Sequence, residues 1–158
     1  MSMRRRHYTT DDSLQKSAEQ MSAIRSQGKV PEFAHALREE GYGRDGSIPA
    51  YEKALESIES SRGVLRAVRE TTNDPSEYGE QLSEAATTLS TVSHHPSIGG
   101  ELPPTLRSLA VDMECLATGA VDPDRAPALA ERVDGTLTDV YTILRTFHEA
   151  SIHLKQQD

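Results

Sequence analysis

The sequence predicts an all-α protein, an antiparallel helical bundle of four long helices and two short ones. Wherever the chain has a clear hydrophobic period, apolar residues recur three and four positions apart, which places them on one face of an α-helix. Glycine or proline marks most joints between such stretches, as expected where helices end and begin. The chain has no Trp and only two Phe. Its core therefore rests on aliphatic side chains, which suit helix seams better than strands.

Two apolar seams are complete, and we expect both in the core. The clearest comprises Tyr78, Leu82, Ala85, Leu89 and Val92. The longest comprises Leu129, Val133, Leu137, Val140, Leu144 and Phe147. The helix that carries the longer seam should start at a cap on Asp122 or Asp124, run to about Lys155 and span roughly 45 Å. We therefore expect its last turns to project beyond the bundle.

Residues 1–9 are predicted to be a disordered basic arm, and residues 10–158 a single helical-bundle domain. Thr10, Asp11 or Asp12 can cap the first helix, because their side-chain oxygens accept hydrogen bonds from free N–H groups of the first turn. The apolar face of this helix comprises Leu14, Ala18, Met21 and Ile24 or Arg25. Gly28 suits the position after its end, which requires a positive φ.

The next two helices have less regular faces. The short helix over residues 31–40 should bury Phe33, Ala36 and Leu37, with Gly41 after it. The helix over residues 48–71 should bury Tyr51, Leu55, Ile58 and Leu65. Arg62 interrupts that seam, and Gly63 in the helix interior costs about 1 kcal/mol relative to Ala.

Helix start signals are strongest at Asp74-Pro75-Ser76-Glu77. Asp74 can cap the helix, Pro75 suits its first position, and Glu77 can reach back to the cap N–H. This helix should end near His94, because Pro96 disfavours helix in the residue before it. Pro104 then opens a helix that ends at Gly119 and buries Leu106, Leu109 or Ala110, Met113 and Leu116.

Charge and composition narrow the function classes. The net charge is −8; the first ten residues hold three arginines and no acid, so the rest carries −11. An acidic body disfavours a broad nucleic-acid or anionic-membrane surface. No secretion signal is recognised, and no apolar run approaches the roughly 20 residues of a membrane span. We expect a cytoplasmic protein. Its single cysteine, Cys115, excludes an intrachain disulfide.

The loop Gly41-Tyr42-Gly43-Arg44-Asp45-Gly46 matches the glycine pattern of dinucleotide-binding loops. That motif requires a preceding strand, and here a helix precedes it. A weaker hypothesis remains, in which Gly43, Arg44, Gly46 and Ser47 bind a small anion at a helix N-terminus, so that the protein is a sensor or enzyme with a pocket between helices. The simpler interpretation is an interhelical turn.

Metal and catalytic motifs are incomplete, so we predict no catalytic residue, cofactor or metal. His148-Glu149 with His153 resembles a zinc motif, but the second histidine stands five positions on, and the two imidazoles diverge. One Glu-x-x-His, Glu32 with His35, is too few for a di-metal bundle. No spacing requires a metal at His94 and His95. Cys115 lies beside Val111 on the flank of a seam, where cysteine is usually a small apolar residue.

The leading hypothesis is a non-enzymatic helical protein that acts through protein–protein association, as an adaptor, assembly or regulatory subunit. Self-association is included, with a dimer favoured. The expected interface is the projecting end of the last helix, at Phe147, Ile152 and Leu154.

A less favoured hypothesis is a nucleic-acid accessory protein whose arm uses Arg4, Arg5 and Arg6 on phosphates. Three phosphate contacts would assist binding but would not form a binding site by themselves. The logarithm of the binding constant would fall with the logarithm of the salt concentration with a slope of only about −3. A solvated tail is the simpler interpretation of these arginines.

Overall fold

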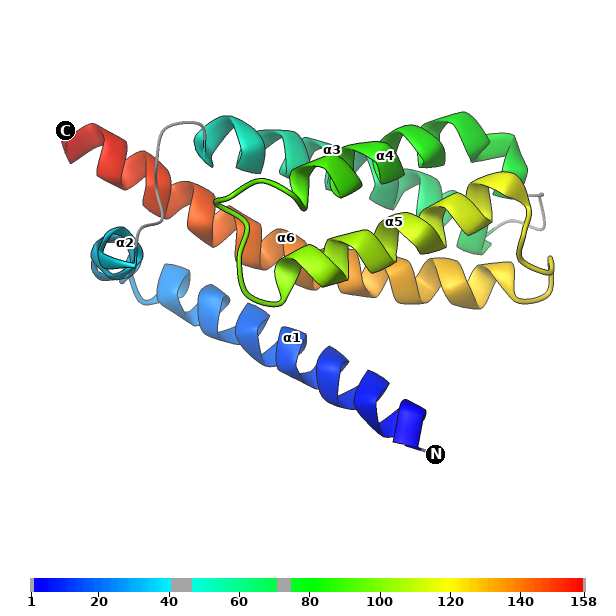
Figure 1. Ribbon diagram of the computed structural model, residues 1–158, viewed down its shortest axis with the longest axis horizontal. Coiled ribbons are helices and arrows are strands. Elements are labelled where there is room, and N and C mark those ends of the chain that lie inside the picture. The colour runs from blue at the N-terminus through cyan, green and yellow to red at the C-terminus, as the bar shows by residue number, and fades with distance from the viewer. Residues whose placement is uncertain (1, 41–46, 71–74, 158) are drawn as a thin grey trace. The chain divides into compact units, whose positions relative to one another are not determined.

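The computed structural model describes residues 2–40, 47–70 and 75–157, and all of its regular structure there is helical (Figure 1). The α-helices are α1 (Ser2–Ser26), α2 (Val30–Glu39), α3 (Ser47–Glu70), α4 (Gly79–Val92), α5 (Leu102–Thr118) and α6 (Ala126–Gln157). A short 3-10 helix, η1 (Pro75–Tyr78), precedes α4. The prediction of an all-α protein is confirmed. No helix in these ranges has the length and apolarity needed to cross a membrane.

The chain divides into two compact units, and the division falls within α3 and α6. Unit 1 comprises Met1–Glu52 and Asp139–Asp158, and unit 2 comprises Lys53–Thr138. The prediction of a basic arm followed by a single domain stays a prediction. Helix α1 is assigned from Ser2, ahead of the caps that the sequence suggests at Thr10, Asp11 or Asp12.

Unit 1 joins α1, α2 and the C-terminal part of α6. Figure 1 views α2 nearly end-on, beside the end of α6. Four buried side chains form the contact: Ala34, Leu37, Ala150 and Leu154. Val30, Phe33 and Phe147 pack around them. The buried face of α2 therefore includes Ala34, while Ala36, which the sequence analysis assigned to it, is exposed.

The α1–α2 joint confirms the role predicted for Gly28. This glycine has φ +69° and follows the end of α1. The next residue, Lys29, donates its N–H to the carbonyl oxygen of Ile24 at 2.9 Å. That bond closes the last turn of the helix and satisfies a carbonyl that would otherwise lack a partner.

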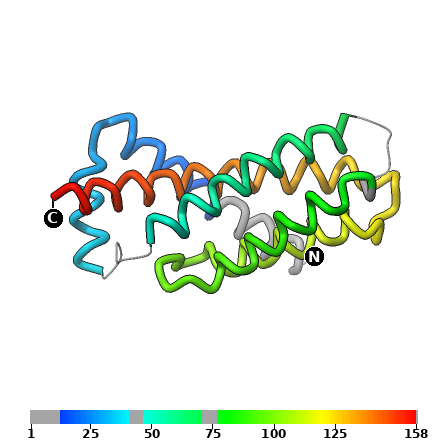
Figure 2. Tube along the Cα trace, turned by 90° about the horizontal axis from the view of Figure 1, so that it is seen from above, coloured from blue at the N-terminus to red at the C-terminus, as the bar shows by residue number. Residues whose placement is uncertain are grey.

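Unit 2 contains the hairpin of α4 and α5, which pack side by side (Figure 2). The predicted seam of α4 is buried at Leu82, Ala85, Leu89 and Val92. The facing seam of α5 is buried at Leu102, Leu106, Leu109, Ala110, Met113 and Leu116. Helix α5 ends as predicted at Gly119, whose φ is +73°. Ala120 then donates its N–H to the Cys115 carbonyl at 3.0 Å.

The start of α4 differs from the sequence prediction. The segment Pro75–Tyr78 forms the 3-10 helix η1, and α4 begins only at Gly79. A tighter 3-10 turn is common at the N-terminus of an α-helix. Asp74, the predicted cap, lies outside the described residues. Gly79 stands against α5: an added Cβ would lie 2.8 Å from the carbonyl oxygen of Ala117.

Ser61 continues the seam of α3 where the sequence analysis placed an interruption at Arg62. The buried positions are Tyr51, Ala54, Ile58, Ser61, Leu65 and Val68, a regular 3-4-3-4-3 spacing. Ser61 fits because its hydroxyl donates to the Ser57 carbonyl at 2.7 Å. Arg62 lies beside the seam, and its Nε is 3.1 Å from Asp134 Oδ1 of α6. Leu55, which the sequence placed in the seam, is half-buried.

We expect Gly79→Ala to destabilise the protein by about 1–3 kcal/mol, because the methyl group would meet backbone that cannot move without separating α4 from α5. Gly63→Ala is the matched control, since a Cβ there meets nothing within 4 Å. It should stabilise α3 by about 0.5–1 kcal/mol. Urea unfolding followed by circular dichroism measures both changes. Equal effects of the two substitutions would contradict the close contact.

Candidate functional site

The side chains predicted as a protein interface at the end of α6 are largely used inside unit 1. Leu154 is only 5% exposed and belongs to the cluster with α2. The Phe147 ring stacks on Phe33 at a centroid distance of 5.6 Å and lies tilted against Tyr51 at 6.2 Å. Ile152 is half-buried. Binding of a partner at these three residues stays a prediction, but the last turns of α6 are covered by α2.

Charged side chains tie α6 to α1 in the same unit. Arg25 Nε lies 3.2 Å from Glu149 Oε2, and Arg145 Nε lies 3.5 Å from Glu149 Oε1. Thr146, which is fully buried, reaches the Met21 carbonyl of α1 at 3.4 Å. These polar groups all contact other groups of the protein, so they contribute to the packing of α6 on α1.

Three polar atoms near the end of α6 are buried without a hydrogen-bond partner in the described structure: His148 Nε2, Ser151 Oγ and His153 Nε2. His148 Nε2 lies 3.6 Å from Glu52 Oε1, which is an ion-pair distance only when the imidazole is protonated and is too long for a hydrogen bond. Because Ser151 Oγ makes no hydrogen bond in the described structure, it is not paired with His148 as a nucleophile is with a base. The two histidines, five positions apart, point to different sides of the helix.

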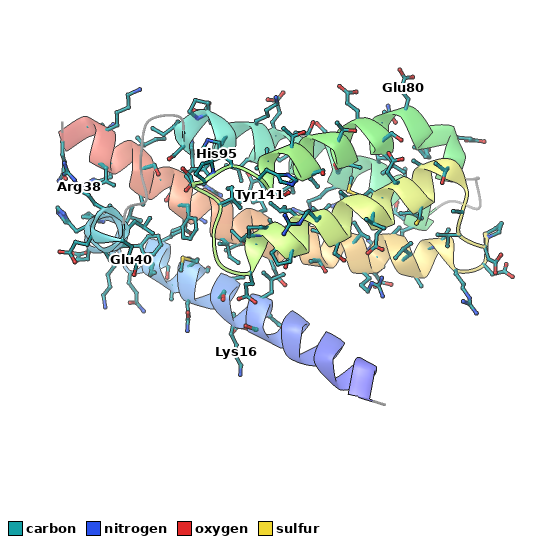
Figure 3. All side chains as sticks on the ribbon, in the orientation of Figure 1. Lys16, Arg38, Glu40, Glu80, His95 and Tyr141 are labelled. Atoms are coloured by element: carbon teal, nitrogen blue, oxygen red, sulfur yellow. The ribbon has the colours of Figure 1, made fainter. Side chains whose placement is uncertain are left out.

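The other sequence candidates are either bonded within their own segment or exposed. His94 donates from Nδ1 to the Ser90 carbonyl at 2.8 Å. His95, in the loop after α4 (Figure 3), accepts the Ser97 N–H at Nδ1, 3.1 Å away. Glu32 and His35 are exposed on α2. Within the described ranges, no group of three or more His, Cys, Asp or Glu side chains could hold a metal ion.

Two predicted sites fall mainly outside the described residues. Gly43, Arg44 and Gly46 of the proposed anion site are outside them, while Ser47 is buried at the first position of α3. Arg4, Arg5 and Arg6 lie within the helix assigned as α1, but their side chains are outside the description. Both hypotheses stay predictions.

Unit 2 has a polar groove between α3 and α4 with a volume of about 470 Å³. Its α3 side presents Lys53, Glu56, Ser57, Ser60, Ser61 and Val64, and its α4 side presents Gln81, Glu84, Ala85 and Thr88. Ser57 Oγ is buried there without a hydrogen-bond partner. The Ser61 and Thr88 hydroxyls both donate to carbonyls of their own helices. Among the described residues, the groove thus holds one buried hydroxyl without a hydrogen-bond partner, that of Ser57.

A second groove of about 630 Å³ lies on the hairpin of α4 and α5. The α4 side presents Ala86, Thr87, Ser90 and Thr91. The α5 side presents Arg107, Ala110, Val111, Glu114, Cys115 and Thr118. We call this surface the α4/α5 groove. Ala86 and Ala110 are buried at its floor, and small side chains there let another helix approach closely.

The threonine hydroxyls of the α4/α5 groove are already bonded to their own helices. Thr87 donates to the Ser83 carbonyl at 3.0 Å, and Thr91 donates to the Thr87 carbonyl at 2.9 Å. Thr118 donates to the Glu114 carbonyl at 3.0 Å. These side chains therefore offer no hydroxyl that needs a ligand, and the groove suits a packing partner better than a polar small molecule.

Val111 distinguishes this groove from the rest of the surface. It is 61% exposed and is the one large hydrophobic side chain exposed among the described residues. Arg107 and Glu114, one turn to either side, are exposed and make no ion pair with other described residues. The half-buried thiol of Cys115 stands at the edge. Val111 is thus a single exposed apolar side chain with a charged side chain one turn away on each side.

Sequence reasoning noted Val111 only as a neighbour of Cys115. A signal was present in the chain: Pro104, Arg107, Val111, Glu114 and Thr118 repeat at the helical spacing 3-4-3-4, on the face opposite the seam. One apolar residue within a polar stripe is too little to identify a surface until the neighbouring helix is known.

Comparisons with known proteins add no identification. The chain matches no protein-family model, and no significant match is found among curated proteins or solved structures.

We expect Leu154→Ala to lower the free energy of unfolding by about 2–4 kcal/mol, because it leaves a cavity between α6 and α2. Lys155→Ala, one position on and exposed, is the control and should change stability by less than about 0.5 kcal/mol. Hydrogen exchange should show the loss of protection in α2 and the end of α6. Unchanged stability of Leu154→Ala would mean that this side chain is free for a partner.

Proposed function

We propose that this protein acts through protein–protein association, as an adaptor, assembly or regulatory subunit without catalytic activity of its own. The observation that supports the proposal is the α4/α5 groove with Val111 exposed at its centre. Leaving a large aliphatic side chain in water is less favourable in free energy than burying it by about 1–2 kcal/mol. A partner that covers it recovers that free energy.

The shape and chemistry of the groove favour a folded partner. Its floor is made of alanines, its threonine hydroxyls are bonded internally, and its open charges stand at the two ends of the apolar centre. These features suit an α-helix packed between two helices. The proposal also includes the finer fold predicted by the sequence, an antiparallel bundle, which would keep the α4/α5 hairpin rigid as a docking platform.

A photo-crosslinking amino acid at position 111 tests the proposal. In an extract of the source cells, irradiation should attach another protein chain to the labelled protein. The same amino acid at position 66 of α3, which is exposed and lines neither groove, is the matched control and should give no adduct. Absence of adducts from position 111, or equal yields from both positions, would contradict the proposal.

A further inference from the structure

We propose that the α4/α5 groove binds a second copy of this chain, with α5 of each copy antiparallel to α5 of the other and the two-fold axis beside Val111. This inference rests on the proposed function and names the partner. It is argued from the exposed face of α5, where the charges are arranged so that the surface is complementary to itself.

Five of the six exposed residues of α5 lie on one narrow face, and the sixth, Ser108, lies just outside it. Pro104, Arg107, Val111, Glu114 and Thr118 are spaced three and four apart, so at about 100° per residue they fall within an arc of roughly 80°. All five are exposed. This face can therefore contact a single neighbouring helix along about four turns.

The stripe is nearly symmetric about Val111. In two antiparallel helices related by a two-fold axis, a residue that precedes the axis meets the residue that follows it by the same number of positions. Arg107 stands four positions before Val111 and Glu114 three positions after it. A two-fold axis half a position before Val111 therefore places the arginine of each copy opposite the glutamate of the other, with the two valines next to each other beside the axis.

The charges at these two positions are available for such pairing. Neither Arg107 nor Glu114 has an ion-pair partner within the described chain, whereas the neighbouring acid Asp112 lies 3.5 Å from Arg132 of the same chain. A parallel pairing of the same faces would place arginine against arginine and glutamate against glutamate, so the charge pattern selects the antiparallel arrangement. The net charge of −8 makes two copies repel at a distance, so association depends on this local match.

The association state of the intact chain tests the proposal. Sedimentation or light scattering over a dilution series up to about 100 µM should give, at the highest concentration, twice the chain mass of 17.3 kDa. Arg107→Glu and Glu114→Arg should each raise the dissociation constant about tenfold or more, because each places like charges together twice. The double variant should dimerise like the natural protein.

The two single variants also test the pairing directly. Mixed in equal amounts, Arg107→Glu and Glu114→Arg should form a heterodimer, because both pairs between positions 107 and 114 are then of opposite sign. Arg66→Glu and Glu131→Arg change the net charge by the same amounts at exposed positions outside the groove, and they should dimerise normally. Circular dichroism of every variant verifies that it is folded.

Several results would overturn the inference: a monomeric natural protein at this concentration, single variants that dimerise as well as their controls, or a mixture that does not associate. A monomer whose position 111 crosslinks to a different protein would overturn this inference and leave the proposed function standing. An adduct of twice the chain mass from position 111 supports both.

Discussion

The close packing of α4 on α5 is the constraint on which unit 2 depends. The two helices bury leucine-rich faces against each other, and Gly79 allows the backbone of α4 to approach the carbonyl of Ala117. Because each helix buries its inner face against the other, the residues on the opposite face of each helix are left at the surface. The α4/α5 groove and the exposed Val111 are consequences of that register.

Unit 1 is stabilised by different contacts. The chain has two phenylalanines, and they stack on each other between α2 and α6. An ion pair and a buried threonine join α6 to α1. The end of α6 therefore contributes to stability within its own unit, and the aromatic ring that the sequence offers for a partner already contacts two others. The proposed association therefore uses the α4/α5 groove, where Val111 is 61% exposed.

The candidate surface carries little free energy in any single residue. In the proposed dimer, one valine from each copy and two charge pairs in all make a modest contact, since exposed ion pairs contribute about 0–1 kcal/mol each. The charge pairs matter mainly because they favour the antiparallel arrangement of the two helices and disfavour the parallel one. A surface of this kind suits reversible association. The three threonine hydroxyls of the groove already donate to carbonyls of their own helices, so they do not need a ligand as acceptor.

The sequence by itself determined the helices and several of their ends, because these depend on residues within about one turn. The seam of α4 from Leu82 to Val92, the seam of α6 from Val133 to Leu144 and the glycines at 28 and 119 follow from such local rules. The tertiary structure decided where the covered arc departs from the apolar pattern. Ala34 is buried in place of Ala36, Ser61 carries the seam past Arg62, and Leu154 packs inward. The direction of a neighbouring helix depends on residues far away in the chain, and a shift of one position changes the buried arc by about 100°. For the same reason, Val111 became a candidate site only when α4 was seen beside it.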